Sequence, residues 1–135
     1  MAAKVPTSAI DSAPEERSYG GNPMSSVERI RSNEFEREVL SAEAPVLVDF
    51  YADWCGSCRA MAPAVEALAE KADGRYQVVK VNVDEDPDLA VRYEIRSIPT
   101  FLIFKDGEIV SHHVGMVSAK RLASALLDAD AFAAK

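Results

Sequence analysis

The sequence predicts an α/β protein with a central mixed sheet of four or five strands and helices on both faces. Three observations favour this class. Short apolar runs alternate with helical patterns from residue 26 onward. Two of these runs, 46–51 and 76–83, are apolar on both faces, as in the central strands of a parallel sheet. The last two runs are joined by an Asp-Gly turn, which is typical of an antiparallel hairpin.

The first elements are expected in the order strand, helix, strand, helix. A short strand is expected near 26–30. The helix after it should have Asn33 as N-cap, with Glu36 three residues later closing a capping box. The strand 46–51 comes next, and a long helix begins at the cysteine motif that follows. Apolar residues recur in this helix at positions that share one face: Met61, Val65, Leu68, Ala69 and Ala72.

A second strand and a short helix are predicted in the middle of the chain. The run 76–83 is rich in valine, as expected of a buried strand. Asp86 then suits the N-cap of a helix, and Pro87 suits its first turn, because a proline there loses no helical hydrogen bond. This helix should reach about Tyr93.

The C-terminal part should form a hairpin and a last helix. The hairpin joins strands 100–104 and 108–114 across an Asp-Gly pair. Ser118 then suits the N-cap of a helix. The apolar residues of that helix are Leu122, Leu126, Leu127 and Phe132.

Size, charge and composition limit the possible functions. The chain has 135 residues, the size of one ordinary domain, and we expect a flexible tail at 1–25 ahead of a domain at 26–135. The net charge of −7 argues against nucleic acid or an anionic membrane as a partner. No apolar run approaches the roughly 20 residues that span a bilayer. The first residues lack the apolar stretch of a secretory signal, so we expect a cytoplasmic protein.

Both cysteines lie three residues apart, directly after the predicted strand 46–51. A disulfide that closes so short a loop constrains the unfolded chain little, so a reversible redox role is favoured over a structural one. A zinc site is the alternative. Zinc usually takes four ligands, and the soft candidates in the sequence are Cys55, Cys58, His112 and His113. It is disfavoured because adjacent histidines in a strand point to opposite faces.

Several ordered motifs resemble the thioredoxin family over roughly residues 26–135. The active-site segment is the strongest of them, and the others follow it in the family's order. They are Val48-Asp49-Phe50-Tyr51-Ala52-Asp53-Trp54-Cys55-Gly56-Ser57-Cys58, Met61-Ala62-Pro63, Lys80-Val81-Asn82-Val83-Asp84, Ile98-Pro99-Thr100-Phe101, Lys105-Asp106-Gly107-Glu108 and Val114-Gly115. The resemblance implies the thioredoxin fold. Two residues depart from the family pattern, since Ser57 replaces a usual proline and Tyr51 a usual tryptophan.

The resemblance and the local chemistry together suggest four catalytic residues. Cys55 precedes a helix, whose unpaired N–H groups favour a thiolate, so it is the expected attacking thiol. Cys58, one turn further on, is the expected resolving thiol and should be the more buried of the two. Asp49 lies in an otherwise apolar strand, where burial raises a carboxyl pKa, and it is the candidate proton acceptor. Lys80 matches the family's lysine partner of that acid. A purely structural role for this pair stays open.

The expected substrate-binding surface surrounds Cys55. The resemblance implies a cis Ile98–Pro99 bond facing the cysteines, which leaves the Ile98 backbone available to an extended client chain. The N–H and hydroxyl of Ser57 are both expected to hydrogen-bond a Cys55 thiolate. The full set of expected binding residues is Trp54, Gly56, Ser57, Ile98, Pro99, Val114, Gly115 and Met116.

The function implied by the resemblance is reduction of protein disulfides by dithiol–disulfide exchange. No bound cofactor is expected, and reducing equivalents should come from NADPH through a thioredoxin reductase. The expected partners are that reductase and disulfide-containing client proteins, and the chain should act as a monomer. Two alternatives remain open: a disulfide oxidase or isomerase, and a non-enzymatic interaction module.

Overall fold

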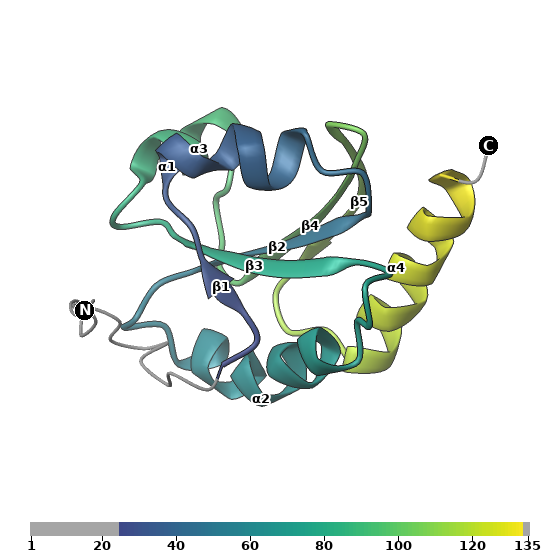
Figure 1. Cartoon of the computed structure of the whole chain (residues 1–135). Coiled ribbons are helices and arrows are strands. Elements are labelled where there is room, and N and C mark those ends of the chain that lie inside the picture. Colours follow the sequence, from purple (N-terminus) through teal and green to yellow (C-terminus); the bar gives the residue numbers. More distant parts are fainter. Residues whose placement is uncertain (1–24, 134–135) are drawn as a thin grey trace, which may run out of the picture.

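The structure is a computed structural model that describes residues 25–133, so the tail predicted at 1–25 lies outside the described part apart from Ser25. Figure 1 shows one sheet with helices on both of its faces. The five strands, in their order across the sheet, are β1 (Glu28–Arg29), β3 (Gln77–Asn82), β2 (Val46–Tyr51), β4 (Thr100–Lys105) and β5 (Glu108–Val114). Strands β1, β3 and β2 are parallel, while β4 and β5 are antiparallel to their neighbours. The predicted mixed sheet is confirmed.

Helices cover both faces of the sheet. The short α1, the π-helical turn η1 and α3 lie on one face, and the long α2 and α4 lie on the other (Figure 1). Their bounds are α1 (Ser32–Phe35), η1 (Glu36–Leu40), α2 (Gly56–Glu70), α3 (Pro87–Arg92) and α4 (Ala119–Ala133). None of the helices in the described range is long and apolar enough to cross a membrane.

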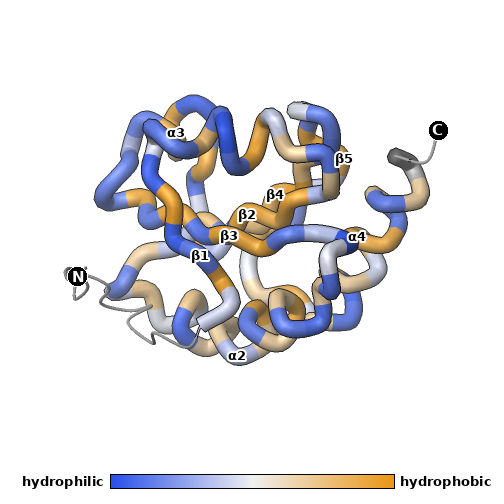
Figure 2. Tube along the Cα trace, viewed as in Figure 1, coloured by the Kyte–Doolittle hydropathy of each residue, from blue (hydrophilic) through white to orange (hydrophobic). Residues whose placement is uncertain are grey.

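The sheet divides the core into two halves, and β2 contributes alternate residues to each. Val46, Val48 and Phe50 pack under α1, η1 and α3, whereas Leu47 packs under α2 and α4. Figure 2 shows hydrophobic residues gathered along β2 and β4 at the centre of the molecule, whereas the helices around them alternate between polar and apolar residues. Because side chains alternate along a strand, Asp49 shares the α2 and α4 face with Leu47. This places a carboxyl inside the core half that α2 covers.

The predicted start of the first helix is wrong in one respect. Its N-cap is Arg31, not Asn33, and the Arg31 N–H donates to the Glu34 carboxylate at 2.8 Å. Asp86, at the N-cap position of α3 as predicted, accepts from the Ser32 N–H at 3.2 Å and from Arg31 Nε at 2.8 Å. A residue distant in sequence therefore accepts a hydrogen bond from a backbone N–H in the first turn of α1. A local capping pattern does not reveal such a partner.

The predicted turn and cap of the C-terminal part are confirmed. Asp106 and Gly107 have φ values of 54° and 81°, as a two-residue hairpin turn requires. A side chain at Gly107 would also meet the Leu40 carbonyl oxygen at 3.3 Å. Ser118 Oγ accepts from the Arg121 N–H at 3.1 Å and so caps α4. These features fix the hairpin and the start of the last helix.

Candidate active site

The cysteine pair lies between the end of β2 and the first turn of α2. Cys55 is the N-cap of α2, with an extended backbone, and Cys58 comes one turn later. Their sulfurs form a disulfide, with the two Cα atoms 5.2 Å apart. Cys55 is 5% exposed and Cys58 is 3% exposed, so a reacting partner must reach the pair through the surface around Cys55.

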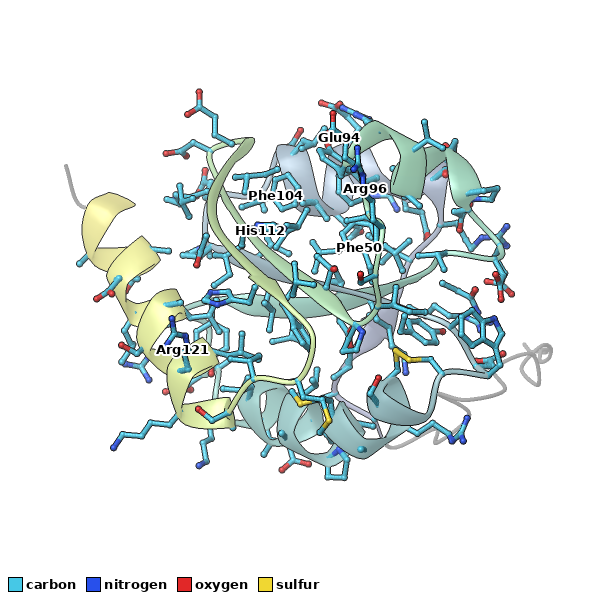
Figure 3. The ribbon with its side chains drawn as sticks, turned by 180° about the vertical axis from the view of Figure 1, so that it is seen from behind. Phe50, Glu94, Arg96, Phe104, His112 and Arg121 are labelled. Carbon is cyan, nitrogen blue, oxygen red and sulfur yellow. A yellow bond between two sulfur atoms is a disulfide. The ribbon has the colours of Figure 1, made fainter. Side chains whose placement is uncertain are left out.

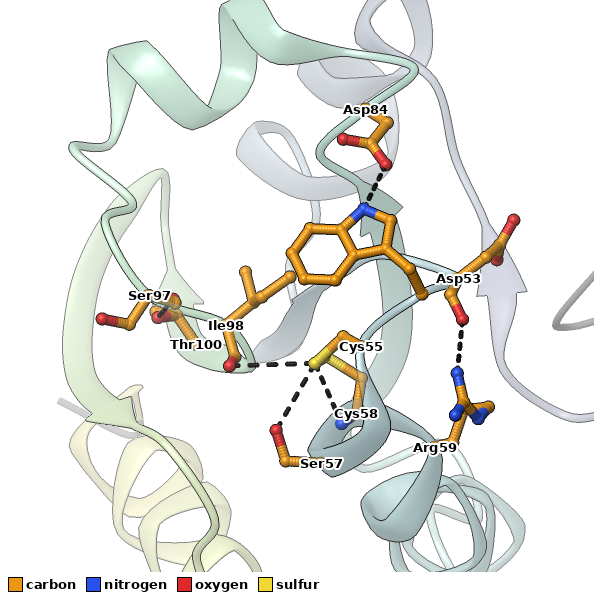
Figure 4. Close-up of a disulfide and its surroundings, with 10 residues drawn as sticks. Asp53, Cys55, Ser57, Cys58, Arg59, Asp84, Ser97, Ile98 and Thr100 are labelled. Carbon is orange, nitrogen blue, oxygen red and sulfur yellow. Dashed lines mark hydrogen bonds between the residues drawn. A yellow bond between two sulfur atoms is a disulfide. The ribbon is translucent and has the colours of Figure 1, made fainter.

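The Cys55 sulfur has three polar neighbours, which Figure 4 shows together. The Cys58 N–H donates to it at 3.2 Å, the Ser57 hydroxyl oxygen lies at 3.4 Å, and the Ile98 carbonyl oxygen lies at 3.9 Å. The expected contact of the Ser57 hydroxyl is present, but the backbone donor is Cys58 rather than Ser57. Donors of this kind stabilise a thiolate when the disulfide is open.

A buried acid and a buried base face each other across β2 and β3. Asp49 and Lys80 are register partners, and Lys80 Nζ lies over the Tyr51 ring at 5.3 Å from its centroid. Burial raises the pKa of Asp49 to about 7, against the opposing effect of Lys80. Burial likewise lowers the pKa of Lys80 to about 8, and Asp49 opposes that change. Asp49 can therefore gain and lose a proton near neutral pH.

No hydrogen bond to Asp49 Oδ1 is present within residues 25–133, although the atom is buried. An acceptor in that state has full capacity to bind a proton or a proton donor. The carboxyl lies on the sheet face that α2 covers, and α2 carries Cys58. This position suits a group that takes a proton from the buried thiol.

Two loops come together on the other side of Cys55. The Ile98–Pro99 bond is cis, as expected, and the Gly115 N–H donates to the Pro99 carbonyl at 2.8 Å. Gly115 has a φ of 85°, a conformation that favours glycine. Within the described part of the chain, no hydrogen bond involves the Ile98 N–H. The Ile98 backbone can therefore pair with a chain lying in extended form.

Exposed apolar side chains surround the entrance to Cys55. Trp54, Met116 and Val114 are 67%, 62% and 53% exposed. Ile98, which is partly buried, packs against the cysteines. The structure thus brings the expected binding residues to one end of the molecule, from three loops that are far apart in sequence. We call Trp54, Ile98, Val114 and Met116 the rim.

One residue at the site was missed by sequence reasoning. Asp84 accepts a hydrogen bond from Trp54 Nε1 at 2.8 Å (Figure 4). The Asp84 N–H in turn donates to Asn82 Oδ1 at 2.8 Å. The segment 84–86 reads as a solvated loop with a helix cap. The available signal was positional: Asp84 follows β3, whose C-terminal end lies beside that of β2. Asp84 orients the exposed indole.

The family model and the three relatives that follow, all similar to this chain, share the description thioredoxin. A family model described as thioredoxin matches residues 26–128. The chain is 48% identical to thioredoxin 1 of Nostoc sp. over 103 residues, which are 76% of this chain and 96% of the relative. It is 52% identical to thioredoxin 1 of Synechococcus elongatus over 92 residues, 68% of this chain and 86% of the relative. A thioredoxin of Pseudomonas aeruginosa is 45% identical over 96 residues, which are 71% of this chain and 88% of the relative.

The chain belongs to the thioredoxin family. With its disulfide-capable cysteine pair, this thioredoxin is a thiol-disulfide oxidoreductase of the protein-disulfide reductase type. Thioredoxins need no bound cofactor, because the two sulfurs themselves carry the electron pair.

Replacing Ser57 with proline is expected to make the reduction potential of this thioredoxin more negative by about 30 mV. The change removes a hydroxyl donor 3.4 Å from the Cys55 sulfur. One hydrogen bond to a charged group contributes about 1.5 kcal/mol at the low end of its range, which corresponds to about 30 mV for two electrons. Proline is tolerated in the first turn of a helix, so the fold should persist. A titration against glutathione measures the potential.

Ser57→Ala is the matched variant, since it also removes the hydroxyl but keeps the backbone N–H. It should shift the potential in the same direction and by a similar amount. An unchanged or less negative potential in Ser57→Pro would show that the hydroxyl does not stabilise the thiolate. A shift in the proline variant alone would assign the effect to the backbone instead.

Proposed function

We propose that Cys55 is the attacking thiol and that it reduces disulfides of client proteins. In the reduced protein the Cys55 thiolate attacks one client sulfur. A new bond forms between Cys55 and that sulfur, the client disulfide breaks, and the second client sulfur leaves as a thiolate that takes a proton from water. The observation that supports this role is the set of donors at the head of α2, the Cys58 N–H and the Ser57 hydroxyl, which lie against the Cys55 sulfur.

In this proposal Cys58 completes the reaction. Its thiol passes a proton to Asp49, directly or through a water molecule, and the resulting thiolate attacks the Cys55 sulfur. The mixed disulfide breaks, the client departs with two thiols, and the electron pair of the dithiol has moved to the client. A carboxyl with a pKa of about 7 suits this transfer, because it is partly ionised at neutral pH and accepts a proton readily. Lys80 limits how far burial raises that pKa.

We assign client binding to the rim and to the Ile98 backbone. An extended client segment would pair with the open Ile98 backbone while its apolar side chains contact Trp54, Val114 and Met116. Met116 has a flexible side chain that adapts to differently shaped partners. Gly56, which is exposed and has no neighbour within 4 Å of an added Cβ, leaves room beside the sulfur for the client backbone.

Reducing equivalents are proposed to come from NADPH through a thioredoxin reductase, with the protein acting as a monomer in the cytoplasm. The family supports a reductase partner in general terms. A reducing compartment fits the direction of the reaction, because the oxidised pair must be reopened after each turnover.

A trapping experiment tests the order of attack. The reduced Cys58→Ser variant is mixed with a disulfide-bonded peptide, and the product is measured by mass spectrometry. We expect a stable adduct of protein and peptide on Cys55, because the second thiol is missing. The wild type treated in the same way should release the peptide as two thiols.

The matched control is Cys55→Ser, which keeps one thiol at the buried position. It should form no adduct at the same peptide concentration and time. An adduct of equal yield on Cys58 in this variant would overturn the assignment of Cys55 as the attacking thiol. Reduction of the peptide by a thioredoxin reductase and NADPH only when the wild type is present would support the proposed electron donor.

A further inference from the structure

A cavity of about 490 Å³ lies beside the rim, between the end of β5 and the start of α4. Val114 and Met116 belong both to the rim and to the lining of this cavity. The rest of the wall includes His112 and His113 from β5 and Arg121 from α4. Figure 3 labels His112 on the edge strand and Arg121 on the helix next to it. A client chain lying across the rim therefore reaches the mouth of this cavity.

The wall of the cavity holds the guanidinium of Arg121 in an otherwise acidic protein. No aspartate or glutamate occurs from residue 109 to residue 127, although the whole chain has a net charge of −7. Arg121 forms no ion pair within the described range. The pKa of His113 is lowered by burial and, in addition, by the positive charges of Arg121 and His112. The Arg121 guanidinium thus lacks a carboxylate partner among the described residues.

The opposite side of the rim has the opposite charge. Asp53 precedes Trp54, and Asp84 holds the Trp54 indole. A client segment that crosses the rim meets carboxylates near Trp54 and a guanidinium beyond Met116. Charge alone would then favour one orientation of a client segment over the other.

We propose that the cavity is a specificity subsite that binds an acidic side chain of the client polypeptide close to the disulfide that Cys55 attacks. A carboxylate there would accept hydrogen bonds from the Arg121 guanidinium, which has the planar geometry for paired contacts with a carboxylate. The subsite rests on the proposed function, because it needs a polypeptide held across the rim. It adds a charge preference to a surface that is otherwise apolar.

Lys120 offers a matched control for a local effect. It has the same charge and lies next to Arg121 in the first turn of α4, but it lines a different cavity, between α2 and α4, with Ala67 and Leu127. Long-range attraction of an acidic client would depend on both residues about equally, since steering follows the summed field. A carboxylate bound inside the cavity beside the rim depends on Arg121 alone.

The test uses short disulfide-bonded peptides of equal length that carry aspartate, asparagine or lysine on either side of the reactive cysteine. The measured quantity is kcat/KM for their reduction by the full chain. We expect the wild type to prefer aspartate over lysine on one of the two sides. Arg121→Gln should lower kcat/KM for that aspartate peptide by about three- to fivefold, the range for an ion pair that water partly screens. It should leave the asparagine peptide unchanged.

The remaining outcomes separate the two proposals. Lys120→Gln should leave every peptide unchanged, and Arg121→Glu should reverse the preference toward lysine. An equal loss in both glutamine variants, or a loss that includes the asparagine peptide, overturns the subsite. Equal kcat/KM for all peptides with the wild type overturns the subsite but leaves the proposed function standing. A wild type that reduces none of the peptides overturns the proposed function itself.

Discussion

Replacing Asp49 with asparagine is expected to make the protein more stable above neutral pH and slower in its disulfide chemistry. Burial raises the pKa of Asp49 from 3.8 to about 7. Between these pH values the folded protein keeps a proton that the unfolded chain has already released. Stability is therefore lost as the pH rises from about 4 to about 7, and the loss stays constant at higher pH.

The size of the effect follows from the same shift. Three pKa units correspond to about 4 kcal/mol of unfavourable free energy when the carboxyl is ionised. The attraction of Lys80 is already contained in that shift, so removing the charge relieves the net penalty. A buried amide without partners costs about 1–3 kcal/mol. The net gain of Asp49→Asn in the free energy of unfolding should be about 2 kcal/mol at pH 8 and should shrink as the pH falls toward 4.

Denaturant unfolding of the oxidised protein at several pH values measures this difference. Asp73→Asn is the control, because Asp73 is exposed in the turn that precedes β3 and has a φ of 48° that asparagine tolerates. It controls for the exchange of a carboxylate for an amide at an exposed position. A gain for Asp49→Asn that is the same at pH 4.5 and at pH 8 would contradict the assignment of the raised pKa to Asp49.

Asp49→Asn should slow the resolving step, in which the Cys58 thiolate breaks the mixed disulfide. A positioned general base contributes typically a hundredfold or more, and water can replace part of it, so we expect a fall of about tenfold to a hundredfold. In the wild type the rate of mixed-disulfide resolution should rise with pH through an inflection near 7, and the variant should lack this inflection. Stopped-flow reduction of a disulfide peptide measures both. An unchanged rate and profile would leave the Asp49–Lys80 pair with a structural role only.

Replacing Cys55 with serine is expected to abolish disulfide reduction, leaving only the rate of the reductant alone. A serine hydroxyl has no appreciable anion at neutral pH, and it cannot form a covalent bond with sulfur under these conditions. The fold should be retained, because serine is a favoured N-cap and accepts the Cys58 N–H as the cysteine sulfur does. Precipitation of reduced insulin in the presence of dithiothreitol measures the activity.

Cys58→Ser provides the comparison for that result. Reduced beforehand and assayed without dithiothreitol, it should release one client thiol per protein molecule and then stop, because no second thiol is present to break the mixed disulfide. Residual turnover in Cys55→Ser of more than a few per cent of the wild type would show that Cys58 alone reduces clients. Circular dichroism of both variants checks that the loss is chemical rather than a failure to fold.

Local patterns in the chain were sufficient to predict most of the architecture. The alternation of apolar runs, the Asp-Gly turn and the cap at Ser118 each depend on residues a few positions apart, and each is confirmed. The cap of α1 was predicted wrongly for the opposite reason. Asp86, more than fifty residues away, accepts from the Ser32 N–H and the Arg31 side chain, and no pattern around Asn33 contains that information.

The same distinction holds at the active site. The spacing of Cys55 and Cys58 and the buried acid at Asp49 are properties of short segments, and these segments by themselves indicate redox chemistry. The contact of Asp84 with Trp54, the pairing of the Gly115 N–H with Pro99 and the cavity at Arg121 each join segments that only the folded sheet brings together. Periodicity and spacing report on neighbours along the chain. The surroundings of the sulfur, and with them its partners, are set by packing between elements that are far apart in sequence.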